Sequence, residues 1–163
     1  MNAMKKILAL ALAGVMALAL LTGCGTGGSA SHKSIAKAMA DYDNGHEGKT
    51  TITYTSSAEL DAKLQERAED PRFKAAVKAV YNGTLTSFTI PSNSDLSGKV
   101  VYLYCGKYDK DAGKQAINLN AHHAYSSSTS SLANVRQIGL ITTSCTDTNG
   151  KEVKVRFAVV VSD

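Results

Sequence analysis

Few of the features that announce a biochemical activity occur in this sequence of 163 residues. It has no Gly-x-Ser-x-Gly segment and no cysteine–histidine arrangement with a recognisable local motif, so neither signature of nucleophilic catalysis is present. Its one cluster of glycines, at 23–28, belongs to a stretch that we interpret below as a linker, which leaves no candidate phosphate-binding loop. Lysine and arginine form no block, and nucleic acid is therefore not expected as a partner.

Metal ligands are also scarce. His122 and His123 are adjacent, and neighbouring residues of a strand point to opposite faces, so the pair is poorly placed to bind one ion. The segment 109–114 begins like a calcium loop, but Lys114 and Asn120 stand where that loop needs glycine and glutamate. We therefore expect no metal and no cofactor. The histidines are interpreted as an exposed strand end or loop, and 109–113 as a hairpin turn.

A single long apolar run is present, from Ile7 to Leu21, and Lys5 and Lys6 precede it. Its 15 residues fall short of the roughly 20 that a helix needs to cross a bilayer core. A basic start followed by a run of this length is typical of a secretory signal peptide. The sequence therefore predicts export, with residues 1–23 as the signal.

The end of this run carries the most specific motif of the chain. Leu21-Thr22-Gly23-Cys24 resembles the lipobox of bacterial lipoproteins. The resemblance implies cleavage before Cys24 and a diacylglyceryl group on its thiol, which would tie the chain to the outer face of the cell membrane, or to the outer membrane where there is one. The alternative is an ordinary signal with a chance cysteine. At least two acyl chains would be attached, enough for stable anchoring.

The remainder is the size of one domain. Removal of 1–23 leaves 140 residues and lowers the net charge from +4 to +2. Residues 24–33, rich in glycine and serine, are interpreted as a flexible tether and 34–163 as the folded domain. Export to an oxidising compartment favours a disulfide between Cys105 and Cys145, and two free buried thiols are the alternative.

Hydrophobic periodicity divides the domain into helices followed mainly by strands. Ser56 and Glu59 have the spacing of a capping box, and Asp70-Pro71 that of a helix start. Asn149-Gly150 predicts a two-residue hairpin turn, in which Leu140 faces Val159 and Cys145 lies off the main core face. The predicted helices are 34–43, 57–69 and 71–82, and the predicted strands are 50–55, 84–90, 99–105, 114–120, 136–145 and 152–161.

Tyr102 and Tyr104 alternate along one of these strands and therefore share a face. On an exposed face they would stack on a sugar or a peptide, so they are our candidate ligand-binding residues. The alternative is that helices cover this face, because both faces of the strand are apolar.

The elements predict an α+β domain, with N-terminal helices packed on one face of a mostly antiparallel sheet of four to six strands. Without a catalytic constellation, the favoured hypothesis is a membrane-anchored lipoprotein that binds a ligand or partner protein of the cell envelope. An envelope hydrolase and a structural subunit of an envelope assembly are the alternatives. A deep pocket joining His122 or His123 to a carboxylate would favour the enzyme.

Overall fold

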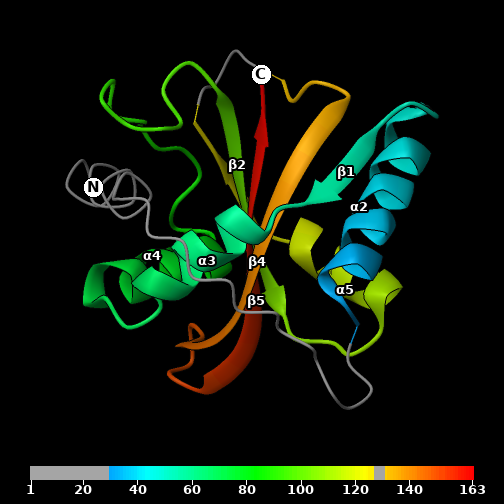
Figure 1. Ribbon diagram of the computed structural model, residues 1–163. Coiled ribbons are helices and arrows are strands. Elements are labelled where there is room, and N and C mark those ends of the chain that lie inside the picture. The colour runs from blue at the N-terminus through cyan, green and yellow to red at the C-terminus, as the bar shows by residue number, and fades with distance from the viewer. Residues whose placement is uncertain (1–29, 127–130) are drawn as a thin grey trace.

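The computed structural model describes residues 30–126 and 131–163, which fold around a five-stranded sheet of order β1-β4-β5-β2-β3 (Figure 1). β1 pairs in parallel with β4, and the other neighbours are antiparallel. The helices are α2 (His32–Glu47), α3 (Ala58–Arg67), α4 (Pro71–Tyr81) and α5 (Ala112–Asn120), and the strands are β1 (Thr53–Ser56), β2 (Val100–Lys107), β3 (His123–Tyr125), β4 (Val135–Thr146) and β5 (Glu152–Ser162).

Helices cover both faces of the sheet, so the predicted fold class is confirmed but the expectation of one covered face is wrong. α2 and α5 pack on one face, with Ile138 and Val160 in their core, and α3 and α4 pack on the other, with Ile141 and Val159. The reason lies in the central strands, since β4 and β5 carry buried apolar side chains at successive positions. Such a strand needs apolar cover on both sides.

The capping residues in the sequence predicted the starts of α3 and α4 to within one residue. Asp70 caps α4 and Pro71 opens it, as predicted. α3 begins one residue later than expected, because Ser57 rather than Ser56 accepts the hydrogen bond of the cap, from Leu60. α2 starts at His32, within the predicted tether, and runs past Gly45 until Gly48 ends it in the left-handed conformation, at a φ of 63°.

Two predicted strands are wrong. Residues 114–120 lie in α5, whose buried residues Gln115, Ala116 and Leu119 follow helical spacing. Asp111 caps this helix by accepting from the backbone of Lys114, so 109–113 leads into a helix rather than around a hairpin. Residues 84–90 make a single bridge, Ser87 to Tyr125, next to the unpredicted strand β3.

The β4–β5 hairpin is correctly predicted, but its register differs by one residue. Leu140 pairs with Ala158 rather than Val159. The Asp147 side chain accepts hydrogen bonds from the backbone of both Asn149 and Lys151, and Gly150 is left-handed at a φ of 77°. These bonds lengthen the loop by one residue, to the three-residue type with a glycine bulge.

The one-residue shift changes the face of the sheet on which Cys145 lies. Cys145 lies on the α3–α4 face, and Cys105 joins the same core from β2. Both are free, buried thiols, so the predicted disulfide is absent. β5 separates their strands, and two strand spacings are about 9.5 Å, beyond the roughly 7 Å that a disulfide spans between Cα atoms.

A thiol titration tests this arrangement. In a Cys24→Ala variant, unfolded in urea without reductant, we expect two reactive thiols per chain, from Cys105 and Cys145. In the native state burial raises the pKa of both thiols, so they should react far more slowly than after unfolding. Recovery of no thiol from the unfolded chain would contradict the strand order.

Candidate functional site: a tyrosine-floored pocket

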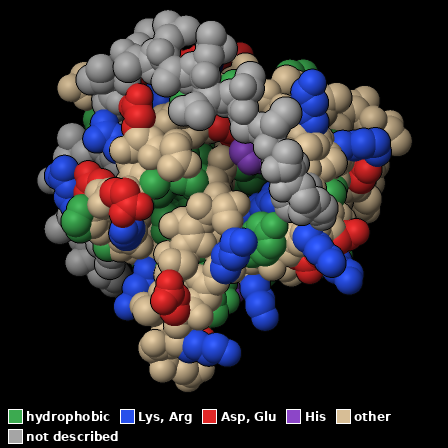
Figure 2. All heavy atoms as spheres, turned by 60° about the horizontal axis from the view of Figure 1, so that its bottom comes forward, with side chains coloured by type: hydrophobic (Ala, Val, Ile, Leu, Met, Phe, Trp, Pro, Cys, Tyr) green, Lys and Arg blue, Asp and Glu red, His purple; other side chains and the backbone are tan. Residues whose placement is uncertain are grey.

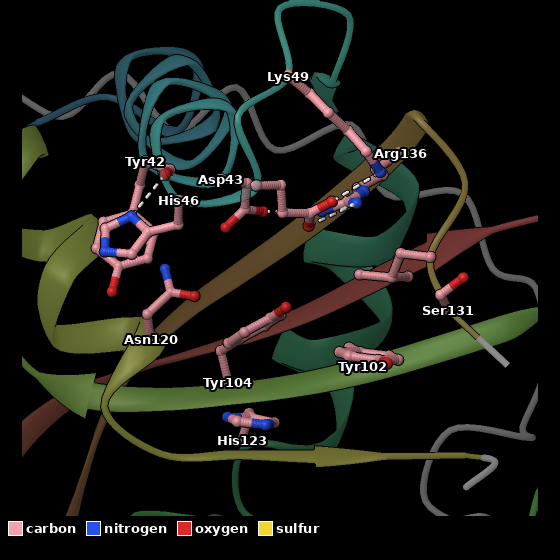
Figure 3. A pocket seen from close by; sticks show the side chains of 12 residues that line it. Tyr42, Asp43, His46, Lys49, Tyr102, Tyr104, Asn120, His123, Ser131 and Arg136 are labelled. Atoms are coloured by element: carbon pink, nitrogen blue, oxygen red, sulfur yellow. Dashed lines mark hydrogen bonds and ion pairs between the residues drawn. The ribbon is translucent and has the colours of Figure 1, made fainter. Parts of the chain in front are cut away.

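A pocket of about 300 Å³ opens on the α2–α5 side of the sheet (Figure 3). The C-terminal half of α2 forms one wall, β2 forms the floor, and the ends of α5 and β4 complete the rim. It is lined by Tyr42, Asp43, His46, Glu47, Lys49, Tyr102, Tyr104, Asn120, His123, Ser131, Leu132 and Arg136.

The two tyrosines predicted from the sequence form the floor of this pocket. Tyr102 and Tyr104 project from β2 to the same side, with ring centroids 6.2 Å apart. Helices do cover this face, so Tyr104 is buried, but Tyr102 lies toward the rim and is only partly buried. The structure thus combines the two alternatives left open by the sequence: one tyrosine belongs to the core and the other borders open space.

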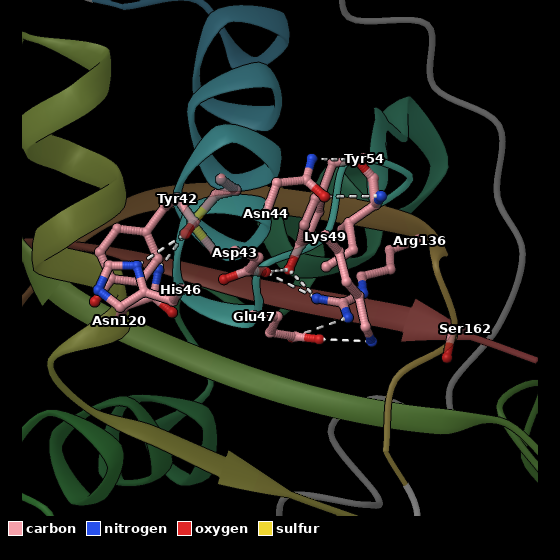
Figure 4. Close-up of polar contacts among 12 residues, drawn as sticks. Tyr42, Asp43, Asn44, His46, Glu47, Lys49, Tyr54, Asn120, Arg136 and Ser162 are labelled. Atoms are coloured by element: carbon pink, nitrogen blue, oxygen red, sulfur yellow. Dashed lines mark hydrogen bonds and ion pairs between the residues drawn. The ribbon is translucent and has the colours of Figure 1, made fainter.

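A buried polar network forms the wall beside this floor (Figure 4). Nη1 of Arg136 donates to Oδ2 of Asp43 at 2.8 Å and to the hydroxyl of Tyr54 at 3.1 Å. Tyr54 in turn donates to the same carboxylate oxygen. The Arg136 side chain is 3% exposed and that of Asp43 is 10% exposed, so this ion pair is almost fully removed from water.

Toward solvent, the network continues in alternating charges. Nη2 of Arg136 lies 3.5 Å from Oε1 of Glu47, and Nζ of Lys49 lies 2.8 Å from Oε2 of the same carboxylate. Nε of Arg136 donates to the carbonyl of Ala133 at 2.7 Å. Every nitrogen of the guanidinium therefore has a partner within the protein, and the charge of Arg136 is balanced before any ligand arrives.

Burial dominates the electrostatics of the network. It raises the pKa of Asp43, and the hydrogen bond from Tyr54 and the charge of Arg136 oppose this only in part. Burial also raises the pKa of Tyr54 and of Tyr104 far above the usual tyrosine value. At the rim, the hydrogen bond from Lys49 lowers the pKa of Glu47. The deep hydroxyls therefore stay protonated at any physiological pH.

Alkaline solution provides a test of the buried floor. In the unfolded chain Tyr104 ionises near 10.0, whereas the folded protein holds it protonated, so its contribution to stability is lost as pH rises above about 10. The expected loss is about 1.4 kcal/mol per pH unit for each such group. The free energy of unfolding of Tyr104→Phe, from urea titrations between pH 9 and 11.5, should therefore fall less steeply than that of the wild type. Parallel curves would show that Tyr104 titrates freely.

The histidines predicted as an exposed end divide between two environments. His123, exposed at the start of β3, stacks parallel to Tyr102, with ring centroids 6.4 Å apart and an angle of 2° between the planes. His122 lies beside the ring of Tyr81 on α4. Among residues 30–126 and 131–163, neither histidine hydrogen-bonds to a carboxylate, and no group of three or more His, Cys, Asp or Glu residues could hold a metal ion.

Asp43 and Arg136 were not predicted as site residues, although the sequence carries a signal for Asp43. Ile35, Met39 and Asp43 are spaced four residues apart and all three are buried, so the carboxylate stands on the apolar stripe of α2. A carboxylate there needs a partner. Nothing local identified that partner, which is 93 residues away on β4.

Charges elsewhere are mixed in sign on the face shown in Figure 2, where Lys and Arg alternate with Asp and Glu. None of the described residues forms a helix long and apolar enough to cross a membrane. The predicted lipidation site, Cys24, and the signal before it lie outside the described residues. The chain matches no protein-family model, no curated protein and no solved structure.

Proposed function

We propose that this protein is an exported lipoprotein, anchored to the membrane through Cys24, whose domain binds a small ligand of the cell envelope without catalysis. The observation that carries the binding function is the solvent-open pocket, in which Tyr102 and Tyr104 form an aromatic floor beside a polar wall whose arginine, Arg136, is already paired within the protein. Such a combination of a rigid wall and exposed ring surface is typical of ligand sites.

The geometry of His123, the pocket histidine on which the hydrolase alternative was based, favours binding over hydrolysis. A general base needs a partner that orients it and a free nitrogen toward the reacting atom. His123 packs on the rings of Tyr102 and Tyr104 instead, and in Figure 3 Tyr104 lies between it and Asp43. Arg136 is likewise engaged by the protein's own acceptors.

The anchor rests on the resemblance of 21–24 to a lipobox and is tested separately. Wild-type chain expressed in a bacterium should partition into the detergent phase of a Triton X-114 extract. Cys24→Ala should stay uncleaved or move to the aqueous phase, because it offers no thiol for the diacylglyceryl group. A wild-type mature chain that starts elsewhere and carries no lipid would refute the anchor and leave the pocket untouched.

Ligand binding is tested with a mixture of neutral, anionic and cationic fragments by saturation-transfer NMR on the full chain in detergent micelles. We expect one or more fragments to bind and Tyr102→Ala to weaken them about tenfold, since it removes ring area from the floor. Tyr108→Ala is the matched control, because Tyr108 packs under Lys154 and Arg156, away from the pocket. Equal loss in both variants, or no bound fragment at all, would refute the binding function.

A further inference from the structure

Two of the polar side chains that line the pocket, Asn120 and Arg136, have their donor groups engaged, whereas oxygen atoms of Asp43 and Asn120 accept no hydrogen bond from the described residues. The Nδ2 group of Asn120 donates to the carbonyl of Ala116 at 2.9 Å and lies 3.5 Å from the sulfur of Met39. The guanidinium of Arg136 is bonded at every nitrogen. Between Asp43 and Asn120, what the pocket lacks is therefore a donor.

Two acceptors face the open space. Both hydrogen bonds to Asp43 use Oδ2, and Oδ1 accepts none from the described residues, although this side chain is nine-tenths buried. Since the amide nitrogen of Asn120 is engaged, its oxygen is left, and Figure 3 shows that oxygen turned toward the space between Asp43 and Tyr104. A carboxylate oxygen and an amide oxygen thus converge above the tyrosine floor.

We infer that the pocket binds a ligand through a protonated amine, with the N–H groups donating to Oδ1 of Asp43 and to the oxygen of Asn120 while the charge lies over the rings of Tyr102 and Tyr104. Aromatic faces attract cations, and a desolvated ammonium gains more from them than a hydroxyl does. A carboxylate ligand would instead meet two uncompensated acceptors. This inference rests on the proposed binding function and adds to it the chemical class of the ligand.

Three probes of equal chain length separate charge from shape: n-butylammonium, n-butanol and butyrate. Each is titrated into the full chain in micelles, with protein-free micelles as the blank, and read by saturation-transfer NMR. We expect n-butylammonium to bind about tenfold more tightly than n-butanol, the factor that a cation over aromatic rings supplies. Butyrate should give no saturable signal.

A charge-adding variant tests the location. Asn120→Asp places a second carboxylate at the proposed amine position and should tighten n-butylammonium binding about fivefold. Asn118→Asp is the matched control on the same helix, because Asn118 bonds the carbonyl of Lys107 outside the pocket, and it should leave the affinity unchanged. Thermal melts of both variants establish that they are folded.

The outcomes distinguish the inference from the proposed function. If n-butanol or butyrate binds as tightly as n-butylammonium, the amine inference is overturned and the binding function stands. Equal effects of the two aspartate variants would likewise overturn the assigned position. If none of the probes and none of the fragments binds, both proposals fail.

Discussion

Gly106→Ala is expected to destabilise the fold by about 3 kcal/mol or more, at or above the usual upper range for overpacking. A Cβ at Gly106 on β2 would lie 2.1 Å from the carbonyl oxygen of Asn118 and 2.6 Å from the backbone nitrogen of Leu119. These are backbone atoms of α5, which cannot move aside as the end of a flexible side chain can. The measurement is the urea midpoint of unfolding, with the slope checked to be unchanged.

On the other face of the sheet, a second glycine also lies directly against a helix. A Cβ at Gly139 on β4 would lie 2.4 Å from Cβ of Leu60, where α3 crosses the strand, so Gly139→Ala should also be strongly destabilising. Gly45→Ala is the matched control: Gly45 lies within α2, and a Cβ there meets nothing within 4 Å. It should stabilise the protein by roughly 0.5–1 kcal/mol, the helix preference of alanine over glycine. Similar midpoints for all three variants would contradict the close helix–strand crossings.

Arg136→Met should cost about 3–5 kcal/mol, the usual result of removing one partner from a buried ion pair. The substitution leaves the carboxylate of Asp43 in the protein interior with Tyr54 as its sole hydrogen-bond donor among the described residues. Burial already raises the pKa of Asp43, and loss of Arg136 removes a charge that opposes this. The protonated form of Asp43 is then favoured further, so the deficit should be smaller at pH 4 than at pH 7.

A double variant separates the lost pair from lost packing. Asp43→Leu combined with Arg136→Met replaces both charges by apolar side chains, and should be more stable than Arg136→Met alone because no uncompensated charge is left buried. Free energies of unfolding for the wild type, both single variants and the double variant give the coupling energy. A double variant whose loss equals the sum of the single losses would show that Asp43 and Arg136 do not act as a pair.

Several features of the structure were predicted correctly from short stretches of sequence. Asp70-Pro71 determined the start of α4, and the alternation of Tyr102 and Tyr104 placed both on one face of β2. These features depend on neighbours within a few residues, which the sequence states directly. The lipobox at 21–24 is a motif of the same local kind, and lipidation at Cys24 stays a prediction.

Tertiary structure decided the rest. The apolar residues of 114–120 fit both the spacing of a strand and that of a helix. The segment lies in α5, and Gly106 has no side chain to keep this helix from lying against β2. Four hydrogen bonds of Asp147, two through its side chain and two through its backbone, set the β4–β5 register, and with it the face of Cys145. The pocket exists because the fold brings Asp43 and Arg136 together across 93 residues. Local sequence patterns predicted α2, α3, α4 and the longer strands, whereas the partner of a buried charge is fixed only when distant strands and helices pack.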